Sequence, residues 1–333
     1  MKKYITSLLF LVCLNTLSAQ DTFSIIAVDP STGEIGSAGA SCVTGVGNGG
    51  IIDIITKIIP GRGGVNSQAY VCIPNVNLNN AIAQMEAGSS PSEIIDWLYN
   101  NDACSSQNFN PEYRQYGIAD FDDLGNPRTA GFSGVSTDDY KEDRQGATYS
   151  VQGNILLGQM VIDQMEANFN DTTTTLADKL MAALQGANFA GADSRCLADG
   201  TSSTTAYLLV YRPEDDPAEP YLRLNVGQQA AGIEPIDLLQ DLYDQFLSVE
   251  QNSIKETFSL YPNPVTNQLQ IEVNPAYSLV SYQILDVNGK VVSTQSGLDT
   301  TRAVVDVSLL SQGVYFIKLR GTQGVVIQKF IKR

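Results

Sequence analysis

The sequence of 333 residues contains no histidine, and this absence excludes several kinds of catalytic and metal site. A Ser-His-Asp triad, a Cys-His pair and a zinc site with histidine ligands all need an imidazole. Carboxylates, lysine, tyrosine and an α-amine remain as groups that can accept or donate a proton. Any catalysis by this chain therefore depends on one of those groups.

Long apolar runs are scarce as well. Met1-Lys2-Lys3 is a basic n-region, residues 5–14 form an apolar h-region, and Ala19 is a small residue suited to signal peptidase. This pattern predicts an export signal over residues 1–19. No later run reaches the roughly 18 apolar residues that a membrane-spanning helix needs. We therefore expect an exported chain that is not an integral membrane protein, with a mature N-terminus at Gln20 or Asp21.

Cysteine is sparse, and signal removal would leave four of the five: Cys42, Cys72, Cys104 and Cys196. An even number in an oxidising compartment favours two disulfides, for which the sequence allows three connectivities. The alternative is buried free thiols, because free cysteine is also a common core residue. The spacing does not fit a CxxC metal knuckle, and the sequence predicts neither a metal nor a cofactor.

Basic residues are few in residues 20–250, which hold 10 Lys and Arg against 31 Asp and Glu. The resulting field repels nucleic acid and anionic lipid, so a polynucleotide is not expected as a partner. Residues 251–333 differ, with 8 basic and 5 acidic side chains and a series of short β-patterns. This change predicts two domains, residues 20–250 and 258–333, joined by a linker at residues 251–257.

Strand and helix patterns come in pairs in the first domain. A hairpin is predicted by β-formers on both sides of the turn at residues 29–33, and Ser90 and Glu93 form a capping box that opens a helix. Further strands are expected over residues 51–59, 65–73, 114–120, 128–132, 147–153, 205–211 and 221–226, and further helices near residues 81–88, 154–169, 176–184 and 235–247. Because these elements do not alternate as βαβ units do, we expect an α+β domain of two antiparallel sheets covered by helices.

The turn between two of these strands is acidic. Asp120, Asp122 and Gly125 imitate part of a calcium loop. Leu124 stands where a ligand is needed and no distal Glu completes the loop, so we predict a plain hairpin turn.

The second domain is all-β by pattern. Strands are expected over residues 268–273, 281–286, 290–293, 304–307, 314–320 and 325–331, and Asn288-Gly289 is a type I′ hairpin signal. Short strands at this density predict a small β-sandwich.

Four motifs of the second domain occur in a specific order. They are residues 261–264 (Tyr-Pro-Asn-Pro), 284–290 (Ile-Leu-Asp-Val-Asn-Gly-Lys), 310–315 (Leu-Ser-Gln-Gly-Val-Tyr) and 329–333 (Lys-Phe-Ile-Lys-Arg). Residues 258–333 thereby resemble the type A sorting domain of the type IX secretion system of Bacteroidota. The resemblance implies contact with that secretion machinery, carriage to the cell surface or the medium, and removal of this domain.

The first domain resembles the domain-of-unknown-function family 1028. The resemblance depends on residues 22–29, 33–36, 64–69, 114–118, 152–156 and 191–196. It implies a four-layer αββα fold of the type found in N-terminal-nucleophile (Ntn) hydrolases. The family has no settled reaction, although some members carry a peptidoglycan-binding domain, which points toward cell-wall amide chemistry.

By this resemblance Thr22 is the candidate nucleophile. In Ntn hydrolases the side chain of residue 1 attacks an amide while its own α-amine acts as the base. Signal cleavage would leave Gln20 and Asp21 in front of Thr22. Either a further cut exposes Thr22, or its hydroxyl is a polar group of the first strand.

The other shared polar residues have both a functional and a structural interpretation. Ser67, Gln68 and Asn154 are candidates for substrate binding or for an oxyanion hole, and Asn154 is alternatively a helix cap.

Three charged residues are candidates for holding a substrate carboxylate: Arg114, Asp193 and Arg195. Alternatively, Asp193 pairs with an arginine as structural support. The sequence therefore predicts a secreted Ntn-like amidohydrolase that acts on a small amide or peptide-like substrate, such as a cell-wall fragment. The alternative is a non-catalytic secreted or surface binding protein that keeps the fold.

Overall fold

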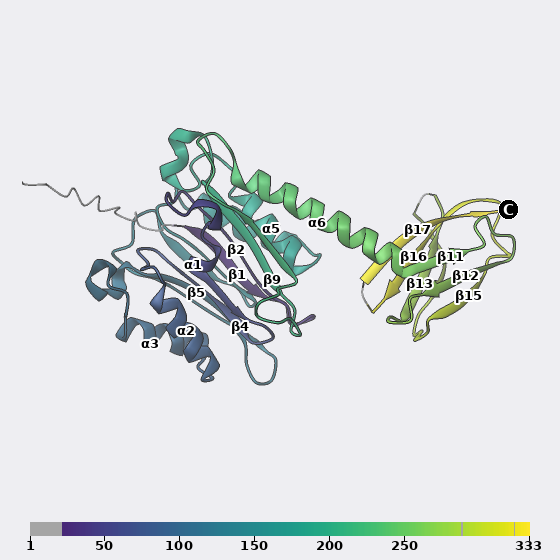
Figure 1. Ribbon diagram of the computed structural model, residues 1–333, viewed down its shortest axis with the longest axis horizontal. Coiled ribbons are helices and arrows are strands. Elements are labelled where there is room, and N and C mark those ends of the chain that lie inside the picture. The colour runs from purple at the N-terminus through teal and green to yellow at the C-terminus, as the bar shows by residue number, and fades with distance from the viewer. Residues whose placement is uncertain (1–21, 288, 323) are drawn as a thin grey trace, which may run out of the picture. The chain divides into compact units, whose positions relative to one another are not determined.

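The computed structural model describes residues 22–333 apart from Asn288 and Gln323, so the predicted signal at residues 1–19 lies outside the described residues. The chain divides into two compact units, the first ending at Leu242 and the second starting at Tyr243. Each unit has its own sheets (Figure 1).

The larger sheet of the first unit has six antiparallel strands in the order β10-β9-β2-β1-β8-β7. The predicted hairpin forms its centre, because β1 and β2 pair from Phe23 opposite Ala40 to Val28 opposite Ile35. The strands are β1 (Phe23–Val28), β2 (Ile35–Ser41), β7 (Glu142–Gln145), β8 (Tyr149–Gly153), β9 (Thr205–Tyr211) and β10 (Leu222–Val226). Every residue of β1, β2, β8 and β9 is buried, as expected for strands covered on both faces.

The second sheet has four antiparallel strands in the order β3-β4-β5-β6. They are β3 (Thr56–Ile59), β4 (Gly63–Gln68), β5 (Gln115–Phe121) and β6 (Pro127–Ser133). The two sheets face each other, since β1 contacts both β4 and β5, and β8 contacts β5. An apolar cluster that includes Ile26, Ala119 and Phe121 fills one end of the space between them.

Helices cover the outer face of each sheet (Figure 1). Helices α2 (Val76–Glu86) and α3 (Pro91–Asn100) pack on the second sheet, where Leu78 and Ile94 join Val65 and Ile118 in one buried cluster. Helices α4 (Met160–Asp171) and α5 (Leu176–Gly186) pack on the larger sheet, through contacts of α5 with β1, β2 and β9 and of α4 with β8. The remaining helices are α1 (Ile52–Ile55), α6 (Pro235–Thr257) and the 3-10 segments η1 (Gly47–Gly49), η2 (Ser106–Phe109), η3 (Pro111–Tyr113) and η4 (Ser194–Asp199).

The second unit packs two sheets around an apolar core. One sheet has the order β11-β12-β15 and the other β14-β13-β16-β17. Their strands are β11 (Phe258–Tyr261), β12 (Gln268–Val273), β13 (Leu279–Leu285), β14 (Val291–Gln295), β15 (Arg302–Asp306), β16 (Gly313–Gly321) and β17 (Gly324–Lys332). Leu269, Ile284, Ile317 and Phe330 are fully buried in this core.

Several local predictions are confirmed. The helix that follows Ser90 begins with Pro91 and has the complete capping box with Glu93. The acidic turn is a hairpin turn in which Asp122 accepts hydrogen bonds from the backbone of Leu124 and Asn126. The four cysteines form two disulfides, Cys42 with Cys196 and Cys72 with Cys104.

Other predictions are wrong. The apolar run at residues 51–59 is a turn of helix, α1, followed by β3, because a short apolar run does not distinguish a buried helix from a strand. The strand expected over residues 65–73 ends at Gln68, where Ala69 and Tyr70 adopt positive φ values. Asn154 does not cap a helix, since α4 begins only at Met160.

Helix α6 continues through residues 251–257, the stretch that the sequence predicts as a linker. Strand β7 has no counterpart in the sequence predictions. Its sequence, Glu-Asp-Arg-Gln, is polar and has few β-formers, so its pairing with β8 is a consequence of tertiary structure.

Candidate functional site

The polar end of the space between the two sheets is the candidate site. Side chains alternate along β1, so that Ser24 and Ile26 point toward the second sheet while Phe23 and Ile25 point away from it. Ser24 bonds to Gln68 of β4, and Ile26 lies against Gly64 of the same strand. Thr22 is two residues before Ser24, and it therefore lies on the same face.

Thr22 is fully buried and its peptide groups are held from two sides. Its backbone N–H donates to the side-chain oxygen of Asn154, Oδ1, at 3.2 Å. Its carbonyl accepts from Nε2 of Gln68 at 2.8 Å and from the backbone N–H of Asn154 at 3.2 Å. Three of the predicted residues, Thr22, Gln68 and Asn154, are thus brought together.

A layer of neutral polar side chains extends from Thr22 between the sheets. Ser24 Oγ donates to Gln68 Oε1 at 2.6 Å and accepts from Gln152 Nε2 at 2.6 Å and from Asn66 Nδ2 at 3.1 Å. All four side chains are fully buried. Their amide and hydroxyl groups satisfy one another, which is the condition under which a polar layer between sheets is stable.

The layer ends at Tyr207 of β9. Asn66 Oδ1 accepts from Ser37 Oγ at 2.9 Å and from Thr56 Oγ1 at 2.8 Å, and both hydroxyls also contact the Tyr207 hydroxyl. Burial raises the pKa of Tyr207 to about 12. Its phenol is therefore protonated at neutral pH, and it adds no charge to the layer.

Gln115 fixes the orientation of Gln68. Its Oε1 accepts from Gln68 Nε2 at 2.8 Å, and its own Nε2 donates to Ser133 Oγ at 2.7 Å and to the carbonyl of Gly153 at 2.9 Å. Gln68 therefore presents its amide nitrogen to Thr22. Ser67, by contrast, lies on the opposite face of β4, where it bonds to Asn75 on the helix side.

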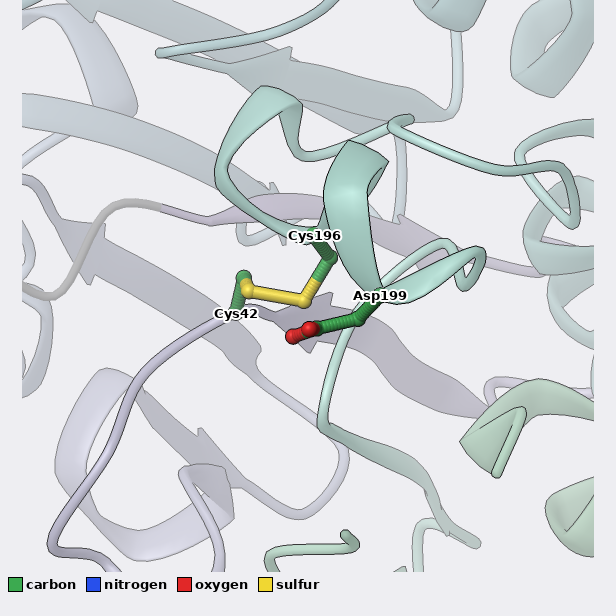
Figure 2. Close-up of side chains that lie close together, drawn as sticks. All are labelled: Cys42, Cys196 and Asp199. Atoms are coloured by element: carbon green, nitrogen blue, oxygen red, sulfur yellow. A yellow bond between two sulfur atoms is a disulfide. The ribbon is translucent and has the colours of Figure 1, made fainter. Parts of the chain in front are cut away.

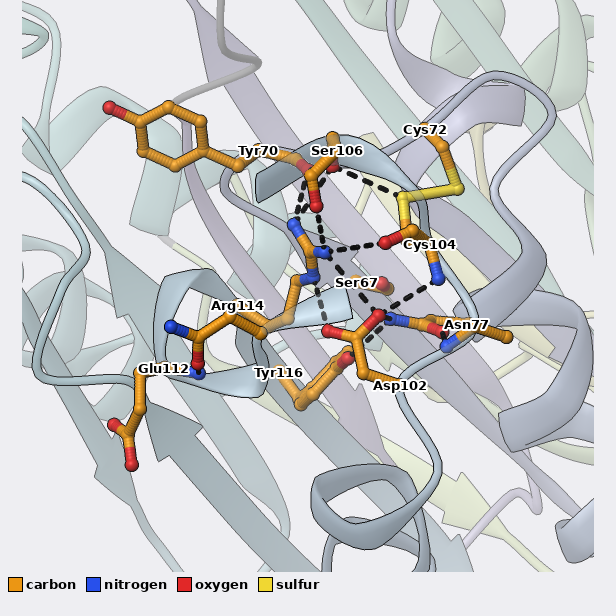
Figure 3. A network of polar contacts seen from close by, with 12 residues as sticks. Ser67, Tyr70, Cys72, Asn77, Asp102, Cys104, Ser106, Glu112, Arg114 and Tyr116 are labelled. Atoms are coloured by element: carbon orange, nitrogen blue, oxygen red, sulfur yellow. Dashed lines mark hydrogen bonds and ion pairs between the residues drawn. A yellow bond between two sulfur atoms is a disulfide. The ribbon is translucent and has the colours of Figure 1, made fainter. Parts of the chain in front are cut away.

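Arg114 forms a buried ion pair with Asp102 (Figure 3). Its Nε donates to Asp102 Oδ2 at 2.7 Å, and each side chain is 1% exposed. The other nitrogens donate to the carbonyls of Tyr70, Cys104 and Ser106 at 2.6, 3.0 and 2.6 Å. A substrate carboxylate could reach this guanidinium only by displacing these bonds.

The same network holds the loop around the second disulfide. Asp102 Oδ1 accepts from the Cys104 backbone at 2.8 Å and from Asn77 Nδ2 at 3.1 Å. Cys104 is joined to Cys72, which follows Tyr70 by two residues (Figure 3). Arg114 and the disulfide together fix the backbone that follows Gln68.

Asp193 pairs with Arg195, as the structural interpretation of these residues predicts. The guanidinium donates from Nε to Oδ1 at 2.9 Å and from Nη2 to Oδ2 at 2.6 Å. Asp193 is fully buried, caps η4 and also accepts from the backbone N–H of Cys42 at 2.8 Å. This pair thus joins η4 to the end of β2.

Cys42, Cys196 and Asp199 lie close enough together to resemble a metal site (Figure 2). The two sulfurs are bonded to each other, so neither is available as a thiolate, which is the form that binds metal. The cluster is therefore a disulfide beside an exposed carboxylate.

Sequence reasoning missed Ser24, Asn66, Gln115 and Gln152. A signal was present, because polar residues two positions apart occur in or directly beside three strands: Thr22 and Ser24, Asn66 and Gln68, Gln152 and Asn154. Alternation places each pair on one face of its strand. Which faces meet, however, depends on the packing of the two sheets.

Two family models match the chain. Residues 22–236 match a family of unknown function, DUF1028, and residues 259–333 match a secretion system C-terminal sorting domain. The chain belongs to the DUF1028 family. Its C-terminal domain is a type IX sorting domain, so this DUF1028 protein is exported and is secreted or displayed at the cell surface. In the described part of the chain, helices are too short or too polar to span a bilayer.

Among solved structures, a DUF1028-family protein from Silicibacter pomeroyi is similar, with a TM-score of 0.52 and 26% identity over 68% of this chain and 88% of that chain. A superoxide reductase (neelaredoxin) from Ignicoccus hospitalis aligns over 23% of this chain and 76% of its own, with 12% identity and a TM-score of 0.18, which is too low to indicate a shared fold. Comparison with curated proteins gives no match.

Proposed function

We propose that this DUF1028 protein is a secreted Ntn-type amidohydrolase in which the Thr22 hydroxyl is the nucleophile. The observation that carries the proposal is the placement of Thr22 just before β1, on the face between the sheets, with its backbone nitrogen 3.2 Å from Asn154 Oδ1. If the chain is cut before Thr22, this nitrogen becomes an α-amine beside the threonine hydroxyl. An α-amine at that position is the base that an N-terminal nucleophile needs.

The arrangement of layers supports the proposal. Helices α2 and α3, the second sheet, the larger sheet, and helices α4 and α5 follow one another in space. We infer that this is the four-layer αββα arrangement of Ntn hydrolases, with the nucleophile at the start of a central strand.

The proposed reaction is an acyl transfer followed by hydrolysis. Thr22 Oγ adds to the carbonyl carbon of the substrate amide while its proton passes to the α-amine. The C–N bond then breaks, the amine leaves with that proton, and water cleaves the ester to regenerate Thr22. We assign the side-chain amide of Asn154 as a donor to the oxyanion, because Asn154 is hydrogen-bonded to Thr22 through both its backbone and its side chain.

The charge of the domain narrows the range of substrates. The 31 acidic residues between positions 20 and 250 disfavour polyanions. A small amide or peptide-like compound, such as a muropeptide from the cell wall, is the substrate that we propose.

The first test is N-terminal sequencing and intact mass of the protein recovered from its native host. We expect a chain that begins at Thr22 and hydrolyses members of a panel of N-acyl amides and muropeptides. Thr22→Ala should abolish hydrolysis and Thr22→Ser should retain part of it, while Thr174→Ala, at an exposed position, is the matched control. A native terminus at Gln20 with full hydrolysis by Thr22→Ala would refute the proposal.

One observation favours the alternative of a non-catalytic binding protein. Thr22 is fully buried, and both Gln68 and Asn154 are engaged in holding its backbone. The alternative predicts a mature chain that begins at Gln20 and binds a ligand equally well with and without Thr22→Ala. Titration of both forms with the same panel distinguishes the two functions.

A further inference from the structure

Three residues near Thr22 have a backbone conformation that is unfavourable for residues with a side chain. Ala69, Tyr70 and Ile155 have φ values of 61°, 46° and 55°. The conformation is least favourable for a β-branched residue such as Ile155. Such residues persist only where their surroundings impose the conformation, and they cluster at functional sites.

These residues directly follow the two side chains that hold Thr22. Ala69 and Tyr70 come after Gln68, which donates to the Thr22 carbonyl. Ile155 comes after Asn154, which accepts from the Thr22 nitrogen. Thr22 is thus held by two segments, which we call the Gln68 arm (residues 68–70, at the end of β4) and the Asn154 arm (residues 154–155, directly after β8). Each arm contains a residue with a left-handed backbone conformation.

Tyr70 and Asp138 connect the two arms. The Tyr70 hydroxyl donates to Asp138 Oδ2 at 2.7 Å. The backbone carbonyl of Asp138 accepts from the N–H of Ile155 at 3.0 Å. A closed chain of bonds therefore runs from Thr22 through the Gln68 arm, Tyr70, Asp138 and the Asn154 arm back to Thr22.

The Tyr70 end of this chain is anchored in the Arg114 network (Figure 3). The Tyr70 carbonyl accepts from Arg114 Nη1 at 2.6 Å and also from the Ser106 hydroxyl. Its ring packs edge-on against Tyr113, with centroids 5.4 Å apart. The phenol is thereby aimed at Asp138 by rigid surroundings.

We propose that Tyr70 is a positioning residue for Thr22, acting through its bond to Asp138. This inference rests on the proposed role of Thr22 as the nucleophile. Without the bond, Gln115 still joins Gln68 to the Gly153 carbonyl, but residues 69–70 and 155 are no longer connected through Asp138. The nitrogen and carbonyl of Thr22 are then less well fixed. Loss of positioning at a nucleophile lowers kcat and leaves substrate binding largely unchanged.

The test compares Tyr70→Phe, Asp138→Ala and the double variant in the full mature chain. Each single variant should lower kcat roughly tenfold, the effect of losing one hydrogen bond to a charged group, with KM changed less than about twofold. The double variant should be no worse than either single variant, because all three lack the same bond. Asp138→Asn keeps an acceptor oxygen and should restore most of the activity.

The matched control is Tyr99→Phe. Tyr99 donates to Glu112 Oε1 at 2.6 Å in an exposed pair of the same chemical type. This variant should have the kcat of the wild type. The inference would be overturned if Tyr70→Phe and Tyr99→Phe changed kcat equally. It would also be overturned if the losses of kcat in Tyr70→Phe and Asp138→Ala were additive in the double variant.

Amide hydrogen exchange separates this inference from the proposed function. Peptides covering residues 22–28 and 152–156 should exchange several-fold faster in Tyr70→Phe and Asp138→Ala than in Tyr99→Phe. If no amide is hydrolysed and these peptides still exchange faster, the proposed function fails while the connection between the arms holds. Unchanged exchange in both peptides refutes the connection, whatever the activity.

Discussion

Replacing Asp102 by alanine would leave the Arg114 guanidinium inside the protein without its carboxylate. The two side chains are each 1% exposed, and Nε of Arg114 is 2.7 Å from Asp102 Oδ2. The carbonyls of Tyr70, Cys104 and Ser106 would still accept from Arg114, but they do not neutralise its charge. Asp102→Ala therefore buries an uncompensated cation.

The magnitude follows from the cost of breaking a buried pair. Removal of one partner typically costs about 3–5 kcal/mol of the free energy of unfolding. Asp102 also accepts from Asn77 Nδ2 and from the Cys104 backbone, and both donors lose that partner. We expect a loss in the upper part of this range.

The assay is equilibrium unfolding in urea, followed by the fluorescence of Trp97. Trp97 is the only tryptophan of the sequence and packs against the core between α3 and the second sheet, so its signal reports on the first unit. The control is Asp53→Ala, which breaks an exposed pair with Arg223 in the same unit. Exposed pairs typically contribute about 0–1 kcal/mol.

Intact mass should first show that the Cys72–Cys104 disulfide is formed in both variants. With the disulfide present, a free energy of unfolding for Asp102→Ala equal to that of Asp53→Ala would refute the reasoning. The Arg114 network would then not need the carboxylate.

Three further variants test other parts of the first unit. Replacing both Cys42 and Cys196 by serine removes a bridge across 154 residues and should lower the free energy of unfolding by about 5 kcal/mol in the chain-entropy account. Gly117→Ala would place a Cβ 1.9 Å from Gln152 Oε1 and should cost about 1–3 kcal/mol by overpacking the polar layer. Burial raises the pKa of Glu34 above its ordinary value of 4.5, so its ionised form is disfavoured in the folded state and stability falls as the pH rises through the raised pKa. Glu34→Gln lacks this loss, and its gain in melting temperature over the wild type should grow from pH 4 to neutral pH.

Exposed positions supply the controls for these variants. Gly49→Ala places its Cβ in open space, so the free energy of unfolding in urea should hardly change. Glu219→Gln, in an exposed loop, should have the melting temperature of the wild type at every pH. If Gly117→Ala lowers the free energy of unfolding no more than Gly49→Ala does, the packing argument is contradicted. If the gain in melting temperature of Glu34→Gln shrinks as the pH rises, the direction of the Glu34 pKa shift is contradicted.

The fold could be predicted where local chemistry decides the structure. The turn residues at positions 29–33 specify the β1–β2 hairpin, and the Ser90–Glu93 capping box specifies the start of α3. The run at residues 51–59 could not be divided into α1 and β3, because both halves are apolar and both are partly buried. The end of β4 could not be predicted either. Ala69 and Tyr70 are not residue types that favour a left-handed conformation, which is imposed on them by tertiary contacts.

The candidate site could be predicted in part. Three of the candidates, Thr22, Gln68 and Asn154, are hydrogen-bonded to one another. Ser67 lies on the opposite face of β4 from Gln68, as the alternation of side chains along a strand requires, a rule that was available from sequence alone. The partner of Arg114 was not predictable, because Asp102 comes from an irregular segment that only the folded chain brings to it. Gln115 was missed because a polar residue in a strand usually indicates exposure, not an inter-sheet layer.

The side chains that hold the peptide groups of Thr22 are neutral and do not supply a base. Gln68 and Asn154 are amides, which do not accept a proton at neutral pH, and burial keeps the Tyr207 phenol protonated. The sequence has no imidazole to take their place. In the proposed mechanism the base is the nitrogen of Thr22 itself, which is basic only as an α-amine and not as a peptide nitrogen. Processing before Thr22 and amide hydrolysis should therefore appear together, and hydrolysis by a chain that still begins at Gln20 would contradict this chemistry.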